Sequence, residues 1–165
     1  MDEKLSAQAL GNRHIVESLD RAFARLHSRS CRLIEATSVA ALYHASVGPS
    51  TGESVLRCAA VVEQTFGGIT ANLWDDPFEW TLPEHLTTPA KIIEHLEEVE
   101  ATRARAFASF TDDECLIKEV ATPAEETQQL IDLLLETLQR ASAHQGQAAA
   151  ARNTVSRSDT PGFII

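Results

Sequence analysis

Residues 50–73 read STGESVLRCAAVVEQTFGGITANL, and this stretch carries the clearest structural signal in the chain. Ser50 and Glu53 stand three residues apart in the arrangement of a capping box, which marks the first turn of a helix. The apolar residues that follow recur at intervals of three or four, as on one face of an amphipathic helix: Val55, Cys58, Val62, Phe66, Ile69 and Leu73. The stretch therefore predicts a helix with one buried face. Its Gly67-Gly68 pair either bends that helix or admits a close neighbour.

Three more segments have helical periodicity. The first covers residues 11–35, the next begins at Thr88-Pro89, and the last runs from a second capping box at residues 122–125 to residue 152. The expected buried residues are Ile15, Leu19, Ala22, Leu26 and Leu33 in the first segment, and Ile92, Leu96, Val99, Ala106 and Phe110 in the next. The expected exposed face of that second segment carries Glu94, Glu97, Glu98, Arg103 and Arg105.

No strand pattern of useful length separates these segments. Four long amphipathic helices predict an all-α fold, a single four-helix bundle, in residues 1–152, followed by a C-terminal tail in residues 153–165. The connection after the first helix allows a crossover in place of a simple up-and-down order.

The composition of the 165-residue chain limits its partners and its location. Hydrophobic residues make up 44% of the chain, which indicates a folded core. The formal net charge is −10, so most of the surface repels nucleic-acid phosphate. No stretch approaches the ~18 apolar residues of a membrane span, and the opening Met1-Asp-Glu-Lys4 lacks the pattern of a signal peptide. Three widely spaced cysteines without a CxxC pair indicate a reduced, cytoplasmic protein.

The segment Ser142-Ala-His-Gln-Gly-Gln147 lies deep inside the last predicted helix. A glycine in a helix interior costs about 1 kcal/mol relative to alanine. Gly146 beside His144 therefore indicates either close helix packing or a ligand site.

The same segment carries a family resemblance. Ala143-His-Gln-Gly-Gln147 resembles the fourth-helix signature of the DinB-like superfamily of bacterial four-helix bundles, His-His-x-Gly-Gln. Residues 54–63 (SVLRCAAVVE) resemble the family's second helix, and residues 87–94 and 107–114 are similar to its third helix and following loop. The resemblance covers residues 12–152. It implies a bundle that often forms homodimers and binds one divalent metal through three histidines. In some members the metal activates a low-molecular-weight thiol for transfer onto an electrophile.

Measured against that pattern, one of the three histidines remains. His144 matches the last of them, Arg140 stands four residues earlier where another histidine is usual, and Cys58 occupies the second-helix position. A guanidinium cannot ligate a metal, and its charge repels one. The resemblance therefore implies either no cofactor or a weakly bound zinc or nickel ion at His144 and Cys58.

Each of these residues has a structural and a functional interpretation. Cys58 either packs as a small hydrophobe or supplies a thiolate to zinc. Arg140 either pairs with Glu136 at the surface or anchors a carboxylate or phosphate between helices. His144 is either a half-buried histidine bonded to a neighbour or part of a pocket wall.

The first functional hypothesis is a small-ligand-binding or vestigial protein that has lost the metal site, with Arg140, His144 and Cys58 at the ligand site. The alternative is a metal-dependent, thiol-transferase-type enzyme with an altered Cys/His site. A third hypothesis is an interaction or dimerisation module. By the family resemblance, the expected partner is a second copy of the chain; neither nucleic acid nor a membrane is expected. The other histidines show no ligand spacing among themselves and are assigned no role: His14, His27, His44, His85 and His95.

Overall fold

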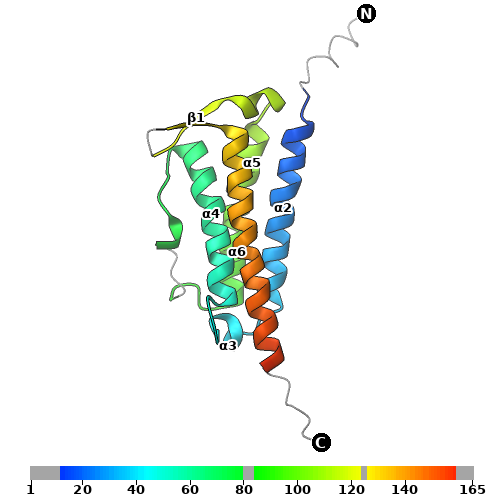
Figure 1. The fold of residues 1–165 in the computed structure, drawn as a ribbon, viewed down its shortest axis with the longest axis vertical. Coiled ribbons are helices and arrows are strands. Elements are labelled where there is room, and N and C mark those ends of the chain that lie inside the picture. The colour runs from blue at the N-terminus through cyan, green and yellow to red at the C-terminus, as the bar shows by residue number, and fades with distance from the viewer. Residues whose placement is uncertain (1–11, 80–83, 124–125, 159–165) are drawn as a thin grey trace, which may run out of the picture.

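The computed structural model describes residues 12–79, 84–123 and 126–158 (Figure 1). The described helices are α2 (His14–Glu35), α3 (Val39–Leu42), α4 (Thr51–Ala71), α5 (Pro89–Ser109) and α6 (Leu130–Ser158), with short 3-10 segments η1 (Pro77–Glu79) and η2 (Asp113–Ile117). Two strands, β1 (Glu119–Ala121) and β2 (Thr127–Gln129), pair as an antiparallel hairpin. The prediction of an all-α fold is confirmed. Within the described ranges, every helix is too short or too polar to cross a lipid bilayer.

The four long helices lie side by side along the long axis of the molecule (Figure 1). Helix α4 packs against α5 and α6, and α2 packs against the same two helices from the other side. Helices α2 and α6 run parallel, because Gln145 bonds the carbonyl of Leu26 while Arg152, farther along, bonds that of Ala36. Helices α4 and α5 run in the opposite direction (Figure 1). Two parallel pairs therefore pack against each other.

A long connection makes α4 and α5 parallel. Along it, the Trp74 carbonyl accepts a hydrogen bond of 2.8 Å from Gln64 Nε2. Farther on, the ring of Phe78 stacks under the guanidinium of Arg57 at 4.0 Å. Trp74 thus contacts Gln64, whereas Phe78, later in the connection, contacts Arg57, which lies earlier in α4. The connection therefore runs back along α4 before α5 begins. The crossover thus follows the second long helix and not the first.

The Gly67-Gly68 pair admits a close neighbour. A side chain at Gly68 would overlap the ring of Trp74, which packs against the helix there. Helix α4 ends at Ala71, and the C-cap residue Asn72 has a left-handed backbone with φ of 55°. Leu73 is consequently 62% exposed, although the apolar spacing predicts a buried residue.

Three aromatic rings occupy the centre of the core. Phe23, Phe66 and Phe107 come from α2, α4 and α5, and their ring centroids lie 5.3–5.7 Å apart. The five apolar residues predicted to be buried in the third long helix are buried: four lie in α5, and Phe110 is its C-cap residue. In α2 the buried face is rotated from the predicted one, because Ile15 is 48% exposed and its neighbour Val16 is fully buried.

The first turn of α2 is capped from a distant part of the chain. Arg13, at the N-cap position, provides no side-chain cap. The carboxylate of Asp113 in η2 instead accepts hydrogen bonds from the backbone N–H groups of Ile15 and Val16, both at 3.0 Å. Residue 113 follows α5 in the chain, so this cap also ties the start of α2 to the end of α5. It satisfies two of the donors that a helix start leaves free.

The predicted start of the fourth helix at residue 122 is wrong. Thr122 closes the β1–β2 hairpin instead: its backbone N–H and its hydroxyl both donate to the carbonyl of Glu126 at 3.0 Å. Val120 pairs with Gln128 in the antiparallel register. Helix α6 begins only at Leu130 and continues to residue 158, past the boundary expected at 152. Residues 124–125 of the expected capping box and 159–165 of the expected tail lie outside the described residues.

The capping box of α4 is confirmed. The backbone N–H of Glu53 donates to Ser50 Oγ at 3.3 Å, and the backbone N–H of Ser50 donates to the Glu53 carboxylate at 2.8 Å. The Ser50 hydroxyl also donates to that carboxylate, at 2.8 Å. Because the backbone and hydroxyl bonds favour the ionised form, they lower the pKa of Glu53 below its usual 4.5.

Replacing Ser50 by alanine is expected to lower the free energy of unfolding by about 1 kcal/mol near neutral pH, through loss of this cap. The lowered pKa of Glu53 means that its carboxylate stabilises the fold above pH 4.5. That contribution disappears as the pH falls through the folded-state pKa. The difference between S50A and the unaltered chain should therefore shrink in acid. Urea unfolding followed by circular dichroism, near neutral pH and well below pH 4.5, measures it; an equal difference at both would contradict the expectation.

Candidate functional site

Cys58, the predicted second-helix ligand, is packed inside the core. It is 3% exposed, and it borders a cavity of about 30 Å³ between α2, α4 and α5. Its sulfur lies 3.9 Å from the hydroxyl of Ser30 on α2. Burial raises the pKa of the Cys58 thiol to about 12, against the smaller opposing effect of Ser30. A thiol in such surroundings behaves as a small hydrophobe.

His144 and Arg140 lie on α6 and have other surroundings. His144 is half-buried, and its Nδ1 lies 3.1 Å from the side-chain oxygen of Gln147. Arg140 is exposed and forms no hydrogen bond or ion pair with any described residue. Its expected partner Glu136 accepts a 3.4 Å hydrogen bond from Gln128 instead.

The structure therefore does not bring the three predicted site residues together. The cavity beside Cys58 faces α2 and α5, whereas Arg140 and His144 belong to α6 and do not line it. Gln145 of α6, which is buried, contacts Ser30, one of the residues that line this cavity. Its amide donates to the hydroxyl of Ser30 at 2.8 Å and to a carbonyl of α2 at 2.7 Å.

A larger cavity opens between the parallel helices α2 and α6. This groove has a volume of about 650 Å³, which lies within the usual range for small-molecule sites. Leucine and alanine side chains form much of its wall, with four arginines beside them. The lining residues are Ala22, Arg25, Leu26, Arg29, Arg32 and Leu33 of α2, and Leu138, Ser142, Gln145, Gly146, Ala149 and Arg152 of α6.

The four arginines give the groove a positive wall. Arg25, Arg29 and Arg32 are spaced by four and three residues and so share one face of α2. All three are exposed, and none has a hydrogen bond or ion pair to a described residue. Arg152 lies across from them on α6, where its Nε donates to the carbonyl of Ala36 at 3.3 Å. No carboxylate is among the described residues that line the groove, although the chain carries a net charge of −10.

Gly146 lines the same groove. A Cβ added at this position would meet no atom within 4 Å. Close helix packing therefore does not require the glycine, and of the two interpretations of Gly146 the packing one is wrong. A small residue here leaves this part of the groove open.

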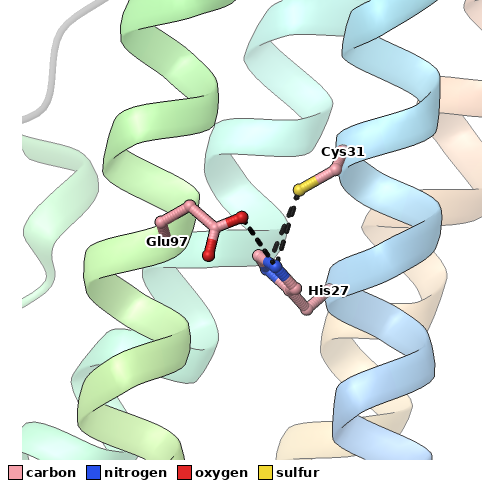
Figure 2. A group of neighbouring side chains, drawn as sticks. All are labelled: His27, Cys31 and Glu97. Carbon is pink, nitrogen blue, oxygen red and sulfur yellow. Dashed lines mark hydrogen bonds and ion pairs between the residues drawn. The ribbon is translucent and has the colours of Figure 1, made fainter.

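A second cluster of chemically active side chains lies between α2 and α5. Figure 2 shows His27 and Cys31 projecting from α2 toward Glu97 of α5. His27 Nε2 lies 3.4 Å from a carboxylate oxygen of Glu97 and 3.6 Å from Cys31 Sγ. The ligand atoms of the three residues all lie within 4.8 Å of one another. The sequence interpretation missed this cluster, because the spacing of histidines was considered only relative to other histidines, and that of cysteines only relative to other cysteines. The available signal was the four-residue spacing of His27 and Cys31, which places both on one helix face.

The surroundings of Cys31 are negatively charged. Burial raises the pKa of its thiol to about 11, and the carboxylates of Glu97, Glu35 and Glu100 add to that increase. The side chain of His27 is 18% exposed, whereas that of Glu97 is 62% exposed. The cluster therefore reaches from the packed interface of α2 and α5 to solvent.

One charged residue near this cluster is buried, although the sequence predicts that it is exposed. Arg103 was expected on the exposed face of its helix, but it is 3% exposed. Its guanidinium forms ion pairs with Asp20 of α2 and with Glu100, the latter through two hydrogen bonds of 2.8 and 2.7 Å. It also lies over the ring of Phe107, 5.2 Å from the centroid. The ion pairs make it possible to bury this charge.

Comparison with protein-family models and with curated proteins finds no significant match to the chain.

Proposed function

We propose that the chain is a DinB-like four-helix bundle that binds a small organic anion in the groove between α2 and α6. The observation that carries the proposal is the group of Arg25, Arg29 and Arg32, which lack acidic partners among the described residues and line a groove in an otherwise acidic chain. Surface arginines of an acidic protein would be expected to pair with its many carboxylates. A groove that gathers unpaired guanidinium groups offers favourable electrostatics to an anion.

The chemistry of the groove favours a carboxylate or phosphate group attached to an apolar body. A guanidinium binds either anion through two parallel hydrogen bonds. The leucines of the wall, Leu26, Leu33 and Leu138, offer apolar contact to the rest of the ligand. The volume of about 650 Å³ suits a molecule of metabolite size. The open position at Gly146 supports the same function.

This proposal retains the ligand-binding hypothesis and changes its residues. Arg140 does not line the groove, so Arg25, Arg29 and Arg32 replace it as the cationic anchor for the anion. His144 and Cys58 are likewise outside the groove lining. Burial of the Cys58 thiol favours neither metal binding nor thiol transfer at that position. The proposal accordingly includes no tightly bound cofactor at residues 58 and 144.

The proposal further includes a homodimer in the cytoplasm that does not bind nucleic acid. The dimer and the location rest on the resemblance to the DinB-like family and on the reduced-cysteine pattern. The net charge of −10 supports the absence of nucleic-acid binding. Light scattering coupled to size-exclusion chromatography tests the dimer.

The groove is tested with phenyl phosphate, an anion that carries an apolar ring, by isothermal titration calorimetry. The double variant R29Q/R32Q should weaken binding about 100-fold, because each charge-assisted hydrogen bond contributes about 1.5 kcal/mol or more. The matched control R105Q/R140Q removes the same charge from exposed positions outside the groove and should change the affinity less than about threefold. Absence of binding to the unaltered chain, or equal loss in both variants, would refute the proposal. Tighter binding of an oligonucleotide than of phenyl phosphate would also count against it.

A further inference from the structure

We infer that His27, Cys31 and Glu97 form a binding site for a zinc ion between α2 and α5. The site lies between α2 and α5, whereas the anion groove lies between α2 and α6, and the two share no residue, so the site goes beyond the proposed function and does not depend on it. It also uses none of the residues that match the family's histidine pattern. The argument rests on the ligand types, their separations and the charge around them.

The three side chains are of the types that zinc prefers: an imidazole, a thiolate and a carboxylate. The four-residue spacing of His27 and Cys31 places both on one face of α2. Glu97 reaches the same point from α5, as Figure 2 shows. Two helices therefore contribute to the site, and the packing of α2 on α5 holds its parts together.

Two of the three separations between ligand atoms match those around a tetrahedral ion. Zinc–ligand bonds of about 2.0–2.3 Å at tetrahedral angles place nitrogen and sulfur about 3.6 Å apart, and nitrogen and oxygen about 3.3 Å apart. The observed distances from His27 Nε2 are 3.6 Å to Cys31 Sγ and 3.4 Å to Glu97 Oε1. Nε2 is the nearer of the two ring nitrogens to the sulfur, since Nδ1 lies 3.9 Å away, and Nε2 is therefore the atom assigned to the ion. The third separation, between Cys31 Sγ and the Glu97 carboxylate oxygen, is at most 4.8 Å.

The surrounding charge favours a cation at this point. Glu35 and Glu100 also act on the Cys31 thiol and disfavour its ionisation when no ion is near. A bound divalent ion reverses that effect, because it stabilises the thiolate directly and the carboxylates then stabilise the ion. Binding releases the thiol proton to solvent. Glu97 lies at the exposed edge, so the fourth position faces solvent and suits a water molecule.

Cobalt(II) tests the site, because a cobalt–thiolate bond produces a near-ultraviolet charge-transfer absorption that nitrogen and oxygen ligands do not. Reduced full-length protein should develop this absorption with one equivalent of cobalt and lose it when zinc is added in competition. Cys31→Ser should abolish the band. Loss of a residue that only hydrogen-bonds to a metal ligand weakens metal binding about 10–100-fold. His27→Gln and Glu97→Gln each remove a ligand and should weaken binding by more than that.

Matched controls separate this site from unspecific binding. Cys115→Ser removes a different thiol, and His95→Gln removes an imidazole of α5 that faces α4, where it pairs with Glu63 at 3.6 Å. Both controls should keep the band and the affinity. Absence of the band in the unaltered protein, or its persistence in Cys31→Ser, would overturn the inference. Binding of phenyl phosphate is measured without metal, so failure of either test leaves the other unaffected.

Discussion

Phe66→Ala is expected to lower the free energy of unfolding by about 3–5 kcal/mol. Phe66 is fully buried, and its ring contacts Phe23 edge-on at 5.3 Å and Phe107 at 5.6 Å. Its removal leaves a cavity where three helices meet, and the two partner rings lose their contacts with Phe66 as well as apolar burial. Equilibrium urea unfolding followed by circular dichroism measures the loss.

The matched control is Phe78→Ala. Phe78 is half-buried in the crossover segment, where it stacks on Arg57. Its loss should cost about 1 kcal/mol, because solvent already reaches the ring and the cation–π contact is worth little at an exposed site. If the two variants lost equal stability, the aromatic cluster would not be the centre of the core.

The double variant D20N/E100Q is expected to lower the free energy of unfolding by about 3 kcal/mol. Both substitutions keep the side-chain volume, but they leave the charge of Arg103 buried without an opposite charge. The estimate stands at the lower end of the range for broken buried pairs, since the side chain of Asp20 is 45% exposed and that of Glu100 20% exposed.

Arg103→Met provides the opposite test and should cost about 1 kcal/mol or less. It removes the one charge of the network that solvent does not reach, and the two carboxylates can then hydrate from the surface. Both variants are compared by urea unfolding at neutral pH. A larger loss in Arg103→Met than in D20N/E100Q would show that the guanidinium acts through packing on Phe107 and not through its charge.

Helices and caps were largely predictable because their signals are local. Ser50 with Glu53 marks one helix start, and Thr88 followed by Pro89 marks another; in each, the cap side chain accepts a hydrogen bond from the backbone N–H three residues later. Periodicity located the buried face of α5, and even Arg103 stood at a buried position, four residues after Val99. The error there came from taking charge as evidence of exposure; partners on α2 decide whether such a charge is buried.

The candidate sites were only partly predictable. The spacing of Arg25, Arg29 and Arg32, and that of His27 and Cys31, is visible in the sequence, since both are repeats on one helix face. Which helix lies opposite is not visible. The expected convergence of residues 58, 140 and 144 assumed a pairing of helix faces, and Cys58 instead faces α2 and α5.

From the sequence alone, the helical class, the caps of α4 and α5 and the acidic character of the chain could be derived, because each depends on residues within a few positions or on composition. The tertiary structure alone decided the return of the chain along α4, the cap that Asp113 provides for α2, the hairpin at Thr122 and the meeting of Glu97 with His27 and Cys31. These features join residues that are far apart in the chain, or exchange one local hydrogen-bond pattern for another. Their free energy comes from the packing of whole helices, which no short stretch of sequence encodes.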